Sequence, residues 1–145
     1  MRLEDWLYGE TDDSCALCAV RGVQLLTLHH IDKNPSNHVY ENLIVLCHNC
    51  HTRYHQGKGV SEDDIRNRKR HLIRKTLTAY GLNALKIAAR NNFGVVAMPF
   101  LLHHTVALGY MTKEEPQMGY GEQEDATARF AVTNRGRLLL STWLE

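Results

Sequence analysis

The pattern of hydrophobic and polar positions near the start of the chain predicts a strand, a loop and a helix. Residues 26–31 (L-T-L-H-H-I) have the pattern of a short strand that ends at two adjacent histidines. An apolar run at residues 43–46 (L-I-V-L) then leads into a cysteine pair. From Cys50 the sequence C-H-T-R-Y-H contains no glycine or proline until Gly57, which is typical of a helix.

A longer helix is predicted over residues 61–80. Ser61 opens the sequence S-E-D-D, so its hydroxyl can cap the helix, and Asp64 takes the capping-box position. Gly81 is the predicted C-cap. The apolar residues that would form the buried stripe of this helix are Ile65, Leu72, Ile73, Leu77 and Tyr80.

The rest of the chain carries both helix and strand signals. Helices are predicted at residues 82–92 and 98–109, the second with Pro99 at the first helical position, where proline is tolerated. Strands are predicted at residues 110–112 and 128–133, separated by a polar, acidic loop.

The glycine-containing segment at residues 56–60 (Q-G-K-G-V) marks the clearest boundary. We therefore expect an α+β fold with a first module at residues 1–58, a basic connecting helix at 61–81 and a mostly helical module at 82–145. At 145 residues the chain is long enough for a second core outside the first module.

Two CxxC pairs, Cys15/Cys18 and Cys47/Cys50, supply the four sulfur ligands of a tetrahedral structural zinc. Closing the long loop between the pairs with a metal would stabilise a region too small for a large core. Two disulfides or unrelated buried thiols are the alternatives. Nothing marks secretion, and CxxC disulfides are usually redox-active, so a structural Zn²⁺ is favoured.

Histidines supply a second candidate site. His51 and His55 are one helical turn apart and share a face, so His29 or His30 could join them. The alternative is that His48 or His51 binds the zinc in place of a cysteine, although four cysteines already complete a tetrahedron. His38 is assigned to a loop without a role.

This stretch resembles the HNH endonucleases, or ββα-metal nucleases, and in particular their zinc-bearing subset. The resemblance rests on the His-His pair, Asn42, the CxxC pairs and the final histidine, which occur in order over residues 15–55. It implies a zinc-stabilised ββα-metal module that hydrolyses DNA phosphodiester bonds and leaves a 5′-phosphate.

The resemblance also implies a role for each residue. His30 would be the general base, and Asn42 would brace the loop and so orient His30. His29, His51 and His55 would hold a catalytic divalent metal (Mg²⁺, Mn²⁺, Ni²⁺ or Zn²⁺). His51 thus belongs to the catalytic set together with His30 and Asn42. Neutral imidazoles suit a borderline transition metal better than Mg²⁺.

The residues after 82 resemble a winged helix-turn-helix domain, on the strength of the run F-A-V-T-N-R-G-R-L-L-L. The helix at the recognition position contains no Arg or Lys, and the predicted loop carries Glu122, Glu124 and Asp125, which phosphate would repel. We therefore expect this winged-helix-like module to bind a protein partner or to form a homodimer rather than to read DNA.

The sequence has 17 basic and 16 acidic residues, so DNA affinity must come from a local patch. The predicted basic helix is the main candidate, with a solvated helix face as the alternative. The candidate DNA-contact residues are Arg53, Arg66, Arg68, Lys69, Arg70, Arg74 and Lys75. The longest apolar run, residues 95–102, is too short to span a bilayer, and acidic residues stand near the start where a signal peptide would have basic ones. We expect a soluble, cytoplasmic protein without a membrane partner.

The sequence therefore favours a metal-dependent DNA endonuclease. One alternative is a catalytically silent, zinc-stabilised DNA-binding or regulatory protein. The other is a nuclease subunit of a larger defence or mobile-element complex.

Overall fold

The computed structural model describes residues 1–114 and 127–144, and it divides the chain into two compact units, residues 1–76 and 77–145. The boundary falls inside the long basic helix, so most of that helix belongs to the first unit and does not form a separate connection. Both helices and small sheets are present, so the fold is α+β.

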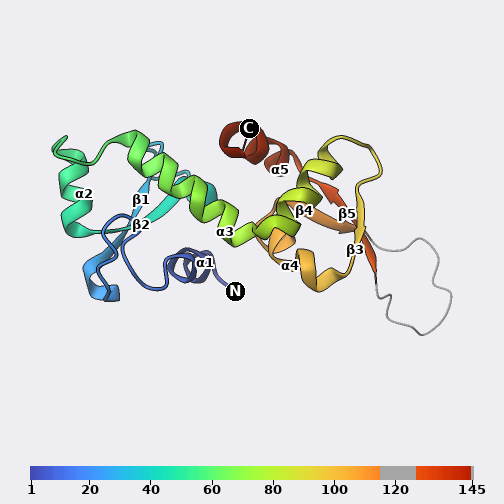
Figure 1. Cartoon of the computed structure of the whole chain (residues 1–145), viewed down its shortest axis with the longest axis horizontal. Coiled ribbons are helices and arrows are strands. Elements are labelled where there is room, and N and C mark those ends of the chain that lie inside the picture. Colours follow the sequence, from blue (N-terminus) through green and yellow to red (C-terminus); the bar gives the residue numbers. More distant parts are fainter. Residues whose placement is uncertain (115–126, 145) are drawn as a thin grey trace. The chain divides into compact units, whose positions relative to one another are not determined.

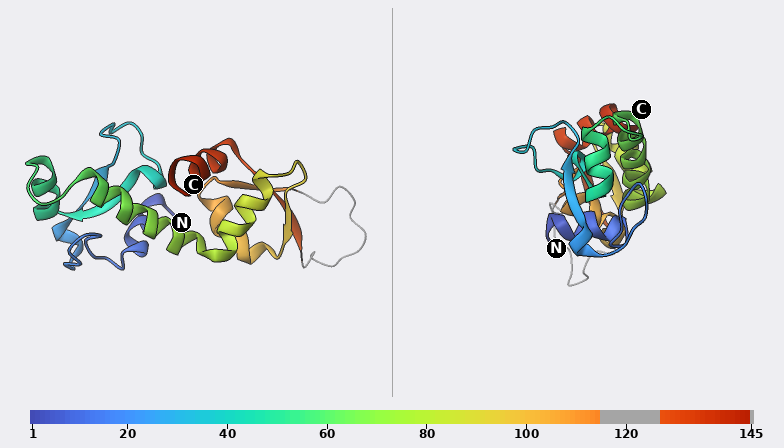
Figure 2. Two further views of the ribbon diagram at one scale, coloured as in Figure 1. Left: turned by 45° about the horizontal axis from the view of Figure 1, so that its top comes forward. Right: turned by 90° about the vertical axis from the view of Figure 1, so that its left-hand side faces the viewer.

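The first unit is built on an antiparallel pair of strands, β1 (Leu26–His30) and β2 (Leu43–Cys47), with Leu26 opposite Cys47 and His30 opposite Leu43. Every residue of β2 is buried, which explains its unbroken apolar run. The connection between the strands stands out from the hairpin in both views of Figure 2 and ends in a short 3₁₀ turn, Tyr40–Asn42.

Helices surround this hairpin in the first unit (Figure 1). Helix α1 spans Leu3–Glu10, and α2 spans His48–His55 and follows β2 directly. A second short 3₁₀ turn, Val23–Leu25, precedes β1. Helix α3 runs from Glu62 to Ala89 and begins as predicted, because Ser61 and Asp64 exchange capping hydrogen bonds of 2.9 and 3.1 Å.

The end of the basic helix differs from the prediction. Gly81 is not a C-cap; it lies within α3, which is broken instead at Thr78 (φ 65°, ψ 164°). The Thr78 hydroxyl accepts a hydrogen bond from the Gly81 N–H (3.4 Å) and so caps the helix that follows. A Cβ at position 81 would lie 2.8 Å from His104 Nε2, so a larger residue would displace the His104 ring from its hydrogen bond to the Leu77 carbonyl (2.7 Å).

The second unit contains a three-stranded antiparallel sheet in the order β3-β5-β4. Its helix α4, Pro99–Ala107, begins at the proline as predicted. The strands are β3 (Val95–Ala97), β4 (Met111–Glu114) and β5 (Ala128–Val132), and α5 (Asn134–Leu139) continues into a π-helical turn, Leu140–Leu144. Strand β3 was not predicted, because three residues are too few to show an alternation. The acidic loop predicted between β4 and β5 lies outside the described residues.

A buried polar network joins α1, the 3₁₀ turn before β2 and α3. The Lys69 ammonium, 0 % exposed, donates to Glu10 Oε1 (2.8 Å) and lies 3.8 Å from the centre of the Tyr40 ring. The Tyr40 hydroxyl donates to Glu10 Oε2, and Thr76 approaches the same oxygen (3.3 Å). Burial lowers the pKa of Lys69, and the charge of Glu10 opposes that shift.

Among the described residues, no helix combines the length and the apolar composition that crossing a membrane requires.

We predict that Lys69→Met lowers the free energy of unfolding of the first unit by about 3–5 kcal/mol, because it leaves the Glu10 carboxylate buried without its cation. Adding Glu10→Gln should restore part of this loss, since the amide has no charge to desolvate. Urea unfolding followed by circular dichroism measures both effects. Arg21→Gln, which breaks the exposed pair with Asp12, is the control and should have little effect. An equally small effect of Lys69→Met would contradict the role of the network.

Candidate metal centres and candidate active site

The four cysteines meet where β2 passes into α2. Their sulfur atoms lie within 4.8 Å of one another, with Cys18 Sγ 3.6 Å from Cys47 Sγ, and all four thiols are free. Cys47 is the N-cap of α2, and its sulfur accepts the Cys50 N–H (3.3 Å). Cys15 Sγ accepts the Leu17 N–H (3.4 Å) in the other pair. The cluster can hold a structural metal ion such as zinc, as predicted from the spacing.

The surroundings of the sulfurs assist deprotonation unevenly. Burial raises the pKa of Cys15, but backbone N–H groups of Cys18, Cys47 and Leu17 outweigh burial and bring that pKa to about 7. Burial and the neighbouring thiols raise the pKa of Cys50. Without a cation, repulsion keeps most of four thiols this close protonated. A metal that binds their thiolates would therefore release protons from them.

His29, His51 and His55 form a second cluster, in which one ring nitrogen of each lies within 4.8 Å of the others. His29 Nδ1 is 3.2 Å from His51 Nε2, which is 2.9 Å from His55 Nε2. Strand β1 supplies His29 and successive turns of α2 supply the other two. The three residues that the sequence placed in one ligand set therefore lie together.

Burial gives this cluster its chemical character. The His29 side chain is 3 % exposed, and its Nε2 has no hydrogen-bond partner among the described residues. Burial lowers the pKa of His29 to about 4, and the rings of His51 and His55 add to the shift. Burial and His55 likewise lower the pKa of His51. Neutral imidazoles present lone pairs, and a divalent cation satisfies several of them at once, so the donor set fits a transition metal.

His30 follows His29 in an extended strand, so the two rings point to opposite sides. His30 Nε2 lies 3.3 Å from His38 Nδ1, and His38 Nε2 lies 3.6 Å from Glu4 Oε1. The sequence left His38 without a role, because its place in a Pro- and Asn-containing loop gives no periodic signal. Only the folded loop brings it to His30.

Asn42 braces the loop that carries His38. Its side-chain oxygen accepts the Asp32 N–H (3.0 Å), and its amide donates to Asp32 Oδ1 (2.9 Å) and to the Asn37 carbonyl (2.8 Å). The Asn42 carbonyl also accepts the Ile31 N–H (2.8 Å), one residue after His30. A buried asparagine thus fixes both ends of the loop beside His30.

The predicted DNA-contact residues do not share one surface. Lys69 is buried in its pair with Glu10, so a phosphate cannot reach it, and its assignment to DNA contact is wrong. The other candidate DNA-contact residues of α3 divide at helical spacing into two flanks: Arg66, Arg70 and Arg74 on one, and Arg68 and Lys75 on the other. Arg53 is placed roughly half a turn round α2 from His51 and His55 and so faces away from the histidine cluster.

Comparison with known proteins gives no match: no family model, no curated protein and no solved structure matches this chain. The assignment of chemistry therefore rests on the residues and their geometry.

We predict that the purified protein holds about one tightly bound zinc per chain. Cys47→Ser or Cys50→Ser should lose this zinc and the fold of the first unit together, because the cluster ties the segment at residues 15–18 to α2. His51→Ala should keep both. Metal analysis with circular dichroism measures the outcome, and release of the tight zinc by His51→Ala but not by Cys47→Ser would reverse the assignment.

The low pKa of His29 predicts a pH dependence of stability in protein whose histidine cluster is free of metal. The unfolded chain binds a proton at the ordinary pKa of 6.5 and the folded chain only near 4. Stability should therefore be complete above about pH 6.5 and fall as the pH decreases towards 4. Urea unfolding between pH 7 and 5.5 gives the slope of the free energy of unfolding against pH. This slope should be shallower in His29→Asn than in the parent, and the difference should be less than about 1.4 kcal/mol per pH unit. Equal slopes would show that His29 is not held neutral.

Proposed function

We propose that the chain is a metal-dependent endonuclease that hydrolyses DNA phosphodiester bonds. The observation that carries the proposal is the convergence of His29, His51 and His55, with a fourth histidine, His30, directed to the other side of the same strand. The geometry supports separate jobs for the two adjacent histidines.

The histidine cluster is the proposed metal site. His29 would hold the ion from the buried side, and His51 and His55 from the more accessible helix. A divalent cation bound there supplies positive charge that stabilises the developing charge on the phosphate and the leaving oxygen. The donor set consists of nitrogen atoms only, which favours Mn²⁺, Ni²⁺ or Zn²⁺ over Mg²⁺.

His30 is the proposed general base, since a neutral imidazole has a ring nitrogen that can accept a proton. Its ring nitrogen that does not face His38 would take a proton from the attacking water, and Nε2 would pass a proton to His38. His38 Nδ1 at 3.3 Å, followed by Glu4 at 3.6 Å from His38 Nε2, offers that proton a route to solvent. Asn42 bonds to the backbone at Asp32 and Asn37, close in the chain to His30 and His38 respectively, and would therefore keep the base in position.

The second unit is proposed as a winged-helix-like module for a protein partner or a second copy of the chain. Four large apolar side chains are exposed within one short segment of this unit: Phe93, Val96, Met98 and Phe100. An exposed apolar cluster of this kind is typical of a contact surface. A nuclease that is active only in a larger assembly fits the same observation.

Paired mutants test the proposal. We predict that His30→Ala lowers the rate of plasmid cleavage by about 10²–10⁴-fold while metal affinity at the histidine cluster stays near that of the parent. His29→Ala should instead weaken the metal site, and higher metal concentration should recover part of its activity. Metal titration and cleavage are measured on the same preparations with several divalent metals.

His48→Ala is the matched control, because His48 lies on α2 but is exposed and belongs to neither cluster. It should cleave like the parent. If His30→Ala loses the metal and His29→Ala keeps it, the two roles are exchanged. If both cleave like the parent, or if the parent itself does not cleave with any metal, the chain is the catalytically silent alternative.

A further inference from the structure

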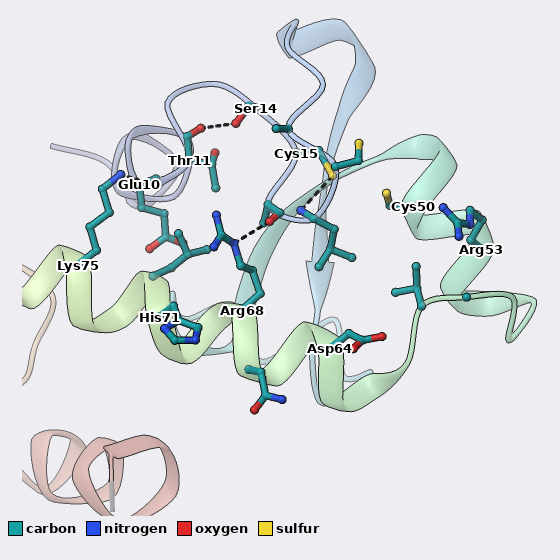
Figure 3. A pocket seen from close by; sticks show the side chains of 18 residues that line it. Glu10, Thr11, Ser14, Cys15, Cys50, Arg53, Asp64, Arg68, His71 and Lys75 are labelled. Carbon is teal, nitrogen blue, oxygen red and sulfur yellow. Dashed lines mark hydrogen bonds between the residues drawn. The ribbon is translucent and has the colours of Figure 1, made fainter.

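A pocket of about 790 Å³ lies in the first unit, between the segment that follows α1, helix α2 with the link after it, and α3 up to Lys75. It borders the cysteine cluster, three of whose members line it. It is separate from the histidine cluster, none of whose members lines it. Figure 3 shows three cationic side chains around it, Lys75, Arg68 and Arg53, with Arg68 between the other two.

Each of these cations is held in place by a backbone carbonyl. Arg68 Nε donates to Ala16 O (2.8 Å), Lys75 Nζ to Glu10 O (3.1 Å), and Arg53 Nε to Lys58 O (3.2 Å). None of the three forms an ion pair within the part of the chain that the structure describes. The charged groups of these three side chains are therefore held in fixed positions and are available to a ligand.

Gly59 allows Arg53 to take up this position. A Cβ built at residue 59 would lie 2.5 Å from Arg53 Nη2, and the backbone there has a positive φ of 77°, which glycine adopts without strain. The guanidinium thus lies directly against the link between α2 and α3.

The two carboxylates in the lining are already engaged. Glu10 accepts hydrogen bonds from buried Lys69 and Tyr40, and Asp64 caps α3 by accepting the Ser61 N–H (2.9 Å). Asp64 is the one carboxylate in the lining that no cation pairs with among the described residues, and Cys15, Cys18 and Cys50 of the cysteine cluster also line the pocket. The case for an anion therefore rests on the three fixed cations themselves and not on the net charge of the lining.

The spacing of the cations excludes a single phosphate as the whole ligand. Arg68 and Lys75 are seven residues apart on α3, which is about 10 Å along the helix axis. One phosphate cannot bridge that distance, whereas successive phosphates of an extended strand can. The lining contains no Phe, Tyr or Trp, so contact with the backbone is favoured over stacking of bases.

We propose that this pocket binds the phosphate backbone of a single nucleic-acid strand, in contact with Lys75, Arg68 and Arg53. The inference goes beyond the proposed hydrolysis, because it requires neither the histidine cluster nor its metal. It assigns the strand contact to one flank of α3 and leaves Arg66, Arg70 and Arg74 outside it. Binding should be independent of sequence and weaken steeply with salt.

The test uses full-length, zinc-loaded protein without a second divalent metal and a fluorescent oligonucleotide of about six thymidines. Anisotropy gives the affinity, and the Nε–H resonances of Arg53 and Arg68 in a ¹H–¹⁵N spectrum report contact directly. We expect Arg53→Gln, Arg68→Gln and Lys75→Gln each to weaken binding roughly tenfold or more, as expected when a charged hydrogen bond is lost. Each should also make the salt dependence shallower.

Arg74→Gln removes the same charge from the other flank of α3 and is the matched control, with an expected change below about twofold. Arg53→Gln and Lys75→Gln keep the test valid if Arg68→Gln, which loses its bond to Ala16, does not fold. Inorganic phosphate should compete only weakly, because it spans one cation. Equal losses for Arg74→Gln and the pocket variants, unmoved Nε–H resonances, or preferential binding of a poly-glutamate peptide would overturn the proposal.

His51→Ala separates this inference from the proposed nuclease. It should lose cleavage and keep oligonucleotide binding in the pocket. If the parent protein cleaves DNA and the pocket variants bind the oligonucleotide as tightly as the parent, the pocket proposal is wrong and the nuclease proposal still stands.

Discussion

The first unit depends on the turn at which β2 becomes α2. Cys47 is the last residue of β2, the N-cap of α2 and a member of the cysteine cluster. The same turn therefore sets the direction of α2 and brings His51 and His55 to His29, which the β1–β2 register places opposite Ile44. A metal at the cysteines would stabilise the turn directly, and the histidine cluster, whose His51 follows Cys50 immediately, would keep its geometry through it.

Burial separates the basic residues of the first unit into an inward-facing one and outward-facing ones. A run of basic residues in α3 looks uniform in the sequence, yet Lys69 turns inward to Glu10 while its neighbours stay outside. The buried pair joins α1 to α3, and its desolvation is tolerated because Tyr40 and Thr76 complete the hydrogen bonds of the carboxylate. The outward cations then fall on two flanks, which explains how a chain with nearly balanced charge can present several cations in one pocket.

Helix α2 separates the two candidate sites. His51 and His55 face β1, whereas Arg53 faces the pocket beside Cys50. A strand bound in the pocket and a phosphate at the histidines would thus lie on different sides of one short helix. In the proposed enzyme, the pocket would hold nucleic acid that is not being cleaved, and the histidine cluster would act on the scissile bond.

The sequence by itself determined most of the local elements, the four-cysteine group and the pairing of His51 with His55. The CxxC spacing indicated four sulfurs around one centre, and helical spacing placed His51 and His55 on one face; both groupings are present in the structure. Ser61 and Pro99 marked helix starts correctly, because capping and the fixed φ of proline act within one turn. The tertiary structure alone decided the burial of Lys69, the approach of His38 to His30, the break at Thr78 and the pocket around Arg68. Each of these depends on residues distant in the sequence, such as Glu10 or His104, whose positions no local pattern encodes.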